Sequence, residues 1–340
     1  MKRSTLRLIV SVTVVFFLAW VFWFSTSNPR ILVLQSVSQP SDWATRVDQG
    51  IRATLRNNRL PVTVVTHYMG LDGAGSDTEI RVAVAAAREA IANNKPDILI
   101  AVDDESNTLV ASQLPVEQRP AIVYTAILQA PKAYDYSAAT RATGVRESVA
   151  SDAIIELLNA VKGDEPLRIA AIGVDDVTGR AELERLKAGQ WSKHTLGPTK
   201  LVNNFVQWQA FVKEAASQAD VLVVLSTDML QGEGPDQFLP EQTVIEWTEA
   251  NSRPLPIGIR DSFVRYGGAL AVASPPSVYG RLAMQMSLDW IANGLSASPP
   301  EPKTVKEFNV AVSASKLKQR GIELPAVYSE LARATSGLYP

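Results

Sequence analysis

Short apolar segments rich in valine and isoleucine recur along the chain between segments with helical spacing, and this alternation limits the fold more than any other feature. The apolar segments do not alternate with polar residues, so we expect strands of parallel sheets that are covered on both faces. The predicted strands are 31–34, 62–65, 97–102, 121–124, 168–172, 221–225, 256–259, 269–273 and 308–312. The predicted helices are 43–56, 79–93, 148–161, 181–188, 208–219, 241–251 and 278–293. The pattern predicts an α/β fold of doubly wound parallel sheets with right-handed crossovers.

An apolar run of membrane length lies near the N-terminus. Three basic residues among the first seven precede residues 8–24, which only Ser11 and Thr13 interrupt. A spanning helix needs about 17–25 residues, whereas the apolar part of a cleaved signal has about 7–15. Residues 1–27 are therefore predicted to be a signal anchor, with a cleaved signal peptide as the alternative. The basic residues before the run predict that the rest of the chain is periplasmic or otherwise extracytoplasmic, held at the cytoplasmic membrane by residues 8–24.

Composition excludes several classes of protein. The 340 residues contain no Cys, which excludes a disulfide scaffold, a Cys-ligated zinc site, a Cys nucleophile and a lipidated cysteine. The formal net charge is -2, and no block of basic residues follows residue 7, so the chain lacks the basic surface that nucleic-acid binding requires. The length after residue 27 exceeds what a single core usually reaches and predicts two lobes.

Polar residues follow most of the predicted strands. In open parallel sheets, ligands bind beyond the carboxyl ends of the strands, so these residues are candidate ligand contacts. They are 35–38, 103–106, 124–125, 175–176, 226–228 and 260–262. Each of them can instead be a helix N-cap, because Ser, Thr and Asp after a strand accept hydrogen bonds from free N–H groups of the next helix. Together they favour a site for a polar small molecule.

Signatures of catalysis are missing from the sequence. It contains no Gly-x4-Gly-Lys-Ser/Thr phosphate loop, no Gly-x-Gly-x-x-Gly after the first strand and no Gly-x-Ser-x-Gly elbow. His67 and His194 are far apart in sequence, and we interpret both as residues without a catalytic role. The acidic run 103–105 has the oxygen ligands that a divalent cation prefers, but a solvated helix N-terminus is the favoured interpretation. We therefore predict no enzyme, no metal site and no cofactor.

Several segments, in order, resemble ABC transporter substrate-binding proteins with the type I periplasmic binding protein fold, in particular aromatic-amino-acid binders. The segments that carry the resemblance are 31–34 with Trp43 and Gly50-Ile51, 94–101, 120–126, 142–145, 277–283, and 308–312 followed by Lys316 and Leu324-Pro325. They extend over roughly 300 residues. The resemblance implies two lobes joined by three crossings, with a ligand between them and closure by hinge motion. Lobe 1 would comprise 30–145 and 268–303, and lobe 2 would comprise 146–267 and 304–340.

The resemblance also implies a set of ligand-binding residues and a partner. The implied contacts are Ser36, Trp43, Asp103, Asp104, Tyr124, Thr125, Asp175, Thr227, Asp228, Arg260, Asp261 and Tyr279. Trp43 or Tyr124 would stack on an apolar part of the ligand, Arg260 would bind a carboxylate and the aspartates an amine. A structural ion pair of Arg260 with Asp228 or Asp261 is the alternative. The implied partner is an inner-membrane permease.

Two features depart from freely diffusing binding proteins of this family. The chain has neither a clean cleavage site nor the Cys of a lipoprotein. A membrane-anchored ligand sensor, or an accessory binding protein for a signalling partner, is therefore the alternative function. An extracytoplasmic hydrolase is a third hypothesis, and the absence of a plausible His partner for a nucleophile counts against it.

Overall fold

The computed structural model describes residues 13, 28–39, 41–71, 76–136, 141–163, 165–232, 234 and 237–340. Apart from Thr13, the predicted anchor at 8–24 lies outside the described residues. Among the helices of the described part, none has the length and apolar character needed to cross a membrane.

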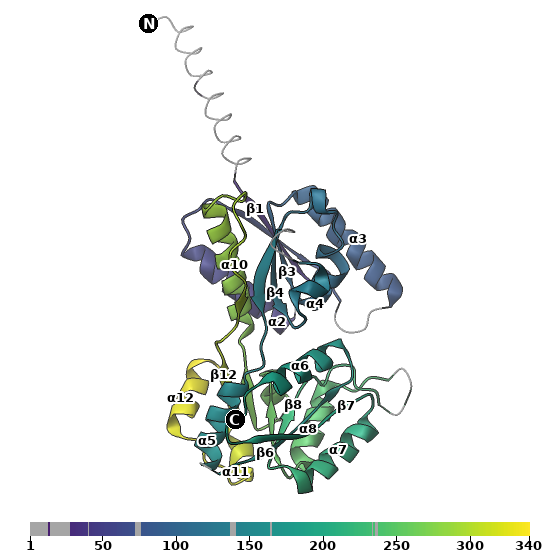
Figure 1. Cartoon of the computed structure of the whole chain (residues 1–340), viewed down its shortest axis with the longest axis vertical. Helices are drawn as coiled ribbons and strands as arrows, with labels where there is room; N and C mark the ends of the chain where they lie inside the picture. Colours follow the sequence, from purple (N-terminus) through teal and green to yellow (C-terminus); the bar gives the residue numbers. More distant parts are fainter. Residues whose placement is uncertain are drawn as a thin grey trace, which may run out of the picture.

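The chain forms two α/β lobes, each built on one sheet (Figure 1). The first sheet has the strand order β11-β5-β4-β3-β1-β2, and every pair of neighbours in it is parallel. Its strands are β1 (Arg30–Gln35), β2 (Thr63–Tyr68), β3 (Ile98–Val102), β4 (Ala121–Ile127), β5 (Ala142–Arg146) and β11 (Lys303–Thr304). The helices around it are α2 (Asp42–Arg56), α3 (Asp77–Asn94), α4 (Asp103–Ser106), η1 (Asn107–Ala111), η2 (Val116–Gln118), η3 (Pro131–Tyr134) and α10 (Pro276–Ala292).

The second sheet has the order β13-β12-β10-β9-β8-β6-β7, in which only the β10–β12 pair is antiparallel. Its strands are β6 (Arg168–Val174), β7 (Thr195–Val202), β8 (Val221–Val224), β9 (Leu255–Gly258), β10 (Leu270–Ala273), β12 (Asn309–Ser313) and β13 (Leu338–Tyr339). Its helices are α5 (Ser151–Lys162), α6 (Val177–Ala188), α7 (Phe205–Gln218), α8 (Glu241–Asn251), α9 (Ser262–Arg265), α11 (Ala314–Gln319) and α12 (Ala326–Ala334). The predicted fold class, two α/β lobes with parallel sheets, is therefore confirmed.

Three segments of the described chain pass between the sheets: 147–150, 274–275 and 305–308. The first and third are hydrogen-bonded to each other, since Val305 donates its N–H to the Arg146 carbonyl (3.1 Å) and Ser148 donates its hydroxyl to the Val305 carbonyl (2.8 Å). The expected boundary at residue 268 differs from this arrangement. Strand β10 pairs with β9 and β12, so the second crossing comes after Ala273, and only from α10 onward does the chain rejoin the first lobe.

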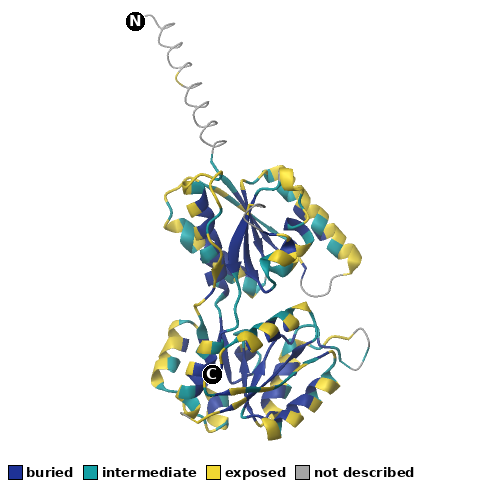
Figure 2. Ribbon diagram, in the orientation of Figure 1, coloured by how far each residue is buried: buried dark blue, intermediate teal, exposed yellow. Residues whose placement is uncertain are grey.

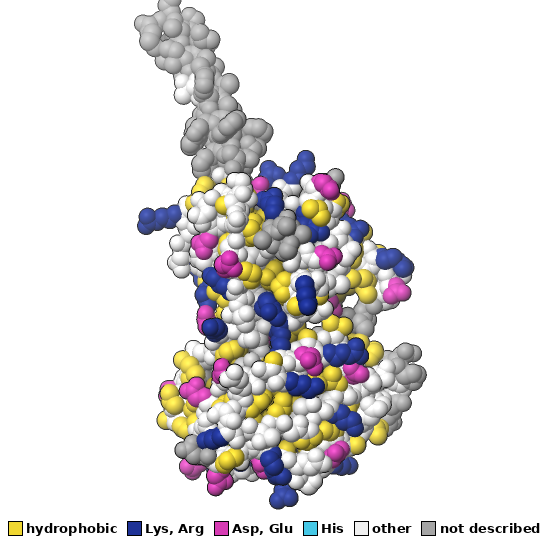
Figure 3. Space-filling view, in the orientation of Figure 1, with side chains coloured by type: hydrophobic (Ala, Val, Ile, Leu, Met, Phe, Trp, Pro, Cys, Tyr) yellow, Lys and Arg dark blue, Asp and Glu magenta, His cyan; other side chains and the backbone are white. Residues whose placement is uncertain are grey.

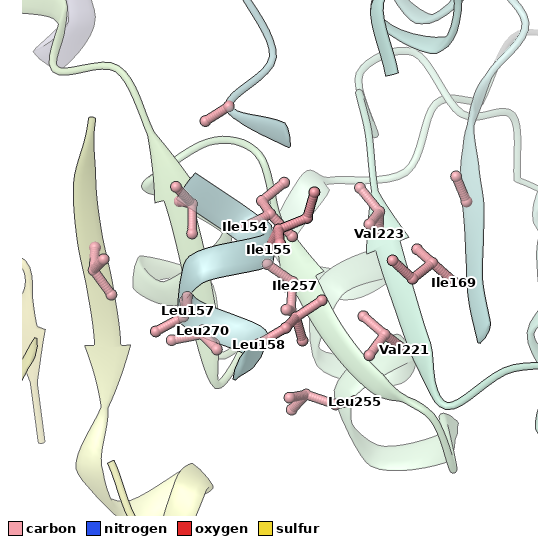
Figure 4. Packing of buried hydrophobic residues seen from close by; sticks show 14 of the residues in the cluster. Ile154, Ile155, Leu157, Leu158, Ile169, Val221, Val223, Leu255, Ile257 and Leu270 are labelled. Atoms are coloured by element: carbon pink, nitrogen blue, oxygen red, sulfur yellow. The ribbon is translucent and has the colours of Figure 1, made fainter. Parts of the chain in front are cut away.

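The central strands of both sheets are buried, whereas the edge strands β2, β7 and β11 are partly exposed, and the helices expose their outer faces (Figure 2). Strand β3 shows why its sequence lacks alternation, because all five of its residues are buried between helices on the two faces. In the second lobe, aliphatic side chains of β6, β8, β9 and β10 pack against Ile154, Leu157 and Leu158 of α5 (Figure 4). Burial of such side chains stabilises the fold by about 1.5–3 kcal/mol each.

Helices α2 and α10 approach each other closely in the first lobe. A Cβ atom added at Gly50 would lie 1.9 Å from the carbonyl oxygen of Ser277, and one added at Gly280 would lie 2.1 Å from that of Val47. Both positions therefore require glycine, because any side chain would have to displace the backbone of the other helix.

We expect Gly280→Ala to lower the free energy of unfolding by about 1–3 kcal/mol, because it inserts a methyl group into a closed helix–helix contact. Urea denaturation of the full chain in detergent micelles measures this effect. Gly197→Ala is the matched control, since its Cβ would have no neighbour nearer than 3.6 Å. Equal stability of the two variants would contradict the close packing.

Candidate ligand-binding site between the lobes

The carboxyl ends of the two sheets face each other at the waist, where direct contacts join the lobes. Arg46 of α2 forms a bidentate ion pair with Asp261, which precedes α9, and its Nη2–Oδ1 distance is 3.0 Å. Arg265 of α9 reaches back to Asp42 of α2 (Nη1–Oδ2 3.0 Å). Figure 3 shows Lys and Arg side chains along the waist on the face in view. This four-residue network, which we call the waist network, holds the first lobe against the second.

In the first lobe, Ser36 and Asp103 form the centre of the strand-end cluster. The Ser36 hydroxyl and N–H donate to Asp103 Oδ2 (2.7 and 3.1 Å), and the Ser106 N–H donates to Oδ1 (2.8 Å). Glu105 lies beside this cluster. Burial raises the pKa of Glu105, and the charges of Asp104 and Asp228 raise it further. Because Asp228 belongs to the second lobe, this effect indicates that the two sets of strand ends are close enough to interact.

Asp104 has a structural role next to the site. Its carboxylate accepts the N–H groups of Leu128 (2.9 Å) and Gln129 (3.1 Å), and the hydroxyl of Tyr134. These bonds tie α4 to the segment that follows β4. The predicted contact Asp104 therefore supports the loop around the site, and few of its lone pairs are left for a ligand.

Aromatic residues lie beneath the strand ends of the first lobe. Tyr124 is buried and stacks on Tyr136 at a centroid distance of 5.6 Å. Trp43 is half-buried against the cluster between the sheet and helices α2 and α10. Thr125 donates its hydroxyl to the backbone carbonyl of Tyr279 (3.1 Å), and the hydroxyl of Tyr279 is buried without a hydrogen-bond partner of good geometry.

In the second lobe, Arg260 joins two carboxylates. Its Nη2 lies 2.7 Å from Glu182 Oε1, and its Nη1 lies 3.0 Å from Asp228 Oδ2. Burial alone would lower the pKa of Arg260, but Glu182, Asp228 and Glu147 hold it well above the ordinary value. The structural ion pair with Asp228, one of the two alternatives given for Arg260, is thus present in the structure.

The remaining predicted residues of the second lobe also have protein partners. Asp175 forms an exposed ion pair with Arg180 (2.6 Å). Thr227 donates its hydroxyl to Glu241 (2.7 Å). Asp261 is held in the waist network.

Backbone conformation singles out three of the strand ends. Asp103, directly after β3, has a φ value of 74°. Ala126, which follows Thr125 in β4, has a φ value of 55°, and Met229, which follows Asp228, has a φ value of 62°. Left-handed conformations of residues other than glycine cost about 1–3 kcal/mol and are concentrated at functional sites. The sequence gives no sign of this feature.

Three carboxyl groups at the waist are held partly protonated near neutral pH. Burial is the main cause of the raised pKa, about 7, of Asp103, Glu147 and Glu241. The Glu182 and Asp104 charges add to the effect at Glu147, and the Asp228 charge adds to it at Glu241. Perturbed carboxyl groups of this kind cluster at functional sites.

Two cavities can be described in the second lobe, and only the first of them adjoins these strand ends. One of about 10 Å³, close to the space of a single water, lies under Arg260 and is lined by Thr227, Glu241 and Phe263 among others. The other, of about 420 Å³, lies between α11, α12 and the end of β12, and its walls are mainly aliphatic. In the described part of the chain, no group of His, Asp and Glu side chains has an arrangement that would hold a metal ion.

Sequence reasoning missed several charged residues of the waist: Arg46, Arg146, Glu147, Glu182 and Arg185. Arg146 and Glu147 directly follow residue 145, where the resemblance placed the boundary of lobe 1, so their position near the site could have been predicted. Glu182 and Arg185 lie three residues apart, on one face of a helix that begins at a strand end. This spacing was the sequence feature from which both residues could have been predicted to lie near the site.

The chain is similar in fold to solved structures of binding proteins. An ABC domain in complex with L-Trp from Streptococcus pneumoniae has a TM-score of 0.62 at 16% identity, covering 92% of this chain and 100% of that one. The ligand-free, open structure of a substrate-binding protein with adhesive properties from Clostridium difficile has a TM-score of 0.63 at 17% identity, covering 88% and 96%. An ABC transporter solute-binding protein from Clostridium phytofermentas with bound L-rhamnose has a TM-score of 0.51 at 11% identity, covering 91% and 99%. Neither the protein-family models nor the curated proteins contain a match.

We expect Arg46→Ala to increase the distance between the lobes, because it removes the central cation of the waist network. The ion pairs are partly exposed, so the free energy of unfolding should fall by only about 1 kcal/mol or less. Because the chain has no Cys, spin labels attached at Glu89→Cys and Lys213→Cys mark only these two positions. Double electron–electron resonance then measures the distance between the two labels. Arg52→Ala, on the same helix with its side chain 69% exposed, is the control. An unchanged distance in Arg46→Ala would show that the network does not hold the lobes together.

We expect Asp103→Asn to gain stability relative to the wild type as the pH rises from 4 to 8. The pKa of Asp103 is about 7 in the folded chain against 3.8 for the free side chain, so the folded state binds the proton more tightly. Its contribution to stability is therefore fully present at low pH and is lost as the pH rises through 7. Asparagine has no such loss, and the difference between the two proteins should approach an upper bound of about 4 kcal/mol. Urea denaturation across this pH range tests the sign, and a pH-independent difference would contradict the assignment.

Proposed function

We propose that this protein is an extracytoplasmic solute-binding protein that captures a small organic ligand between its two lobes for an ABC importer. The observation that carries the proposal is the meeting of two sets of polar strand ends at a waist bridged by three crossings. Ligands of open parallel sheets bind at this edge. The similarity in fold to binding proteins supports the same conclusion, and an extracytoplasmic location is part of the proposal.

An amino-acid-like ligand is favoured by the chemistry of the waist. Asp103 and Asp228 offer carboxylates to an amine, and Tyr124 or Trp43 offers an aromatic face to an apolar part of the ligand. Asp228 is the more exposed partner of Arg260, with its side chain 45% exposed against 1% for Glu182. A ligand carboxylate can therefore reach Arg260 only by replacing Asp228. The other predicted contacts, Ser36, Asp104, Thr125, Asp175, Thr227, Asp261 and Tyr279, would line or support the same site.

Anchoring and the identity of the partner belong to the proposal. Residues 8–24 would hold the binding lobes at the cytoplasmic membrane, where an inner-membrane permease takes over the ligand. The absence of Cys and the length of the apolar run at 8–24 favour one second candidate, a membrane-anchored sensor that reports ligand occupancy to a signalling protein. Co-purification of the full chain with a permease or with a signalling protein distinguishes the two roles.

We expect at least one member of a panel of L-amino acids, sugars and small carboxylates to bind the full chain saturably in detergent micelles. A ligand at about a hundred times its dissociation constant adds roughly 2.7 kcal/mol of stability, because it binds only the folded state. The melting transition followed by fluorescence of the seven Trp residues, and then calorimetry, measures this effect. Asp103→Ala should abolish the shift, and Arg333→Ala, on the exposed face of α12, should preserve it. No shift with any compound, together with turnover of a reporter ester or glycoside, would replace the binding proposal with a hydrolase.

A further inference from the structure

Two guanidinium groups at the waist have no carboxylate partner. Arg146 ends β5, and Arg185 lies on α6 of the second lobe. Among the described residues, no carboxylate lies within ion-pair distance of either one. The Arg185 guanidinium donates instead to the backbone carbonyl groups of Glu147 and Ile127. The Arg146 guanidinium donates no hydrogen bond to the described residues, and its Nε is buried.

The other arginines of the waist differ from this pair. Arg46 is held by Asp42 and Asp261, and Arg265 by the same two residues. Arg260 is held by Glu182 and Asp228. A ligand carboxylate would have to displace a carboxylate of the protein to reach any of these three. Arg146 needs no such exchange with the described part of the chain, because no described residue accepts a hydrogen bond from its guanidinium group.

The position of Arg146 connects it to the candidate site. In the register of β4 and β5, Tyr124 pairs with Gly144, and Arg146 follows two residues later opposite Ile127. The positive charge of Arg146 also opposes the rise in the pKa of Tyr124 that burial causes. Arg185 lies near Arg146, because it donates a hydrogen bond to the carbonyl of Glu147, the residue that follows Arg146. The charge of Arg146 adds to the lowering of the pKa of Arg185 that burial causes. Two like charges in a partly buried place repel each other, and a bound anion would remove that repulsion. Glu147 offsets the charge of Arg185 only in part, because burial raises the pKa of this carboxyl group to about 7.

We propose that Arg146, assisted by Arg185, binds a carboxylate of the ligand beside Tyr124, and that Arg260 is a structural residue that orders Glu182 and Asp228. The proposal rests on the proposed binding function and narrows its ligand class to small carboxylates. The planar fork of Arg146 suits bidentate contact with a carboxylate. Asp103 and Glu105 lie at the neighbouring strand end, where Ser36 and Ser106 donate hydrogen bonds to Asp103 and no described cation forms an ion pair with either carboxyl group. A ligand with an amine as well as a carboxylate therefore satisfies both ends of the site.

The test compares matched ligands with and without a carboxylate. Full-length wild type, Arg146→Gln, Arg146→Lys and the control Arg333→Gln are titrated by calorimetry with the L-amino acids, their carboxamides, the corresponding decarboxylated amines, and L-rhamnose and D-ribose. We expect a carboxylate-bearing compound to bind the wild type and to lose at least about tenfold in affinity in Arg146→Gln. Arg146→Lys should recover part of the lost affinity, since lysine restores the positive charge but cannot make the bidentate contact of a guanidinium group. The carboxamide of the same compound should bind weakly and equally to all four proteins.

The possible failures separate the two proposals. If the wild type binds a neutral sugar or an amine, and Arg146→Gln binds it equally well, the role of Arg146 is wrong and the binding function stands. If a carboxylate binds but Arg260→Gln, with an unchanged melting temperature, loses affinity while Arg146→Gln does not, Arg260 is the receptor and the inference is overturned. If the wild type binds none of these compounds, the proposed function and the inference based on it both fail. Equal melting temperatures of wild type and Arg146→Gln without ligand show that the variant is folded.

Discussion

Burial of the central strands of two largely parallel sheets is the constraint on which the rest of the molecule depends. Strands such as β3 have apolar neighbours on both faces, so they have no room for polar side chains along their length. Polar groups are therefore confined to the places where strands end. Because the strands around each site run in the same direction, these ends gather at one edge of each sheet, and the crossings bring the two edges face to face. The location of the candidate site follows from the way the strands are packed.

Charge balance decides what this edge can bind. Most of its acidic and basic groups already satisfy one another, as Arg260 does with Glu182 and Asp228, and a buried charge that is left alone is costly. Groups with protein partners set the shape of the site, and groups without them are available to a ligand. Asp104, which supports a loop, and Asp261, which bridges the lobes, belong to the first kind. Asp103 lies between the two kinds, because it accepts hydrogen bonds from Ser36 and Ser106 but forms no ion pair with a described residue.

The sequence predicted nine of the strands and seven of the helices because each is a continuous apolar run or has an apolar face of helical spacing. It did not predict β7, which contains Gly197 and Pro198, lies at the edge of its sheet and has a register shift against β6. The sequence also did not predict where the second crossing lies. Strand β10 is as apolar as the strands of the first sheet, and only its pairing with β9 and β12 shows that it belongs to the second sheet. The strand-end residues were found, but their partners were not, because Arg46 and Asp261 are 215 positions apart in the chain.

The glycine contact between α2 and α10 has a mechanical consequence. Helix α10 begins directly after the crossing at 274–275, and its backbone touches that of α2 at Gly50 and Gly280. The N-terminal turns of α2 carry Trp43 and Arg46 to the waist. At these two points no side chain separates the helices, so α2 and α10 are coupled as one body. Any rotation of the first lobe at the crossing would therefore carry Trp43 and Arg46 with it.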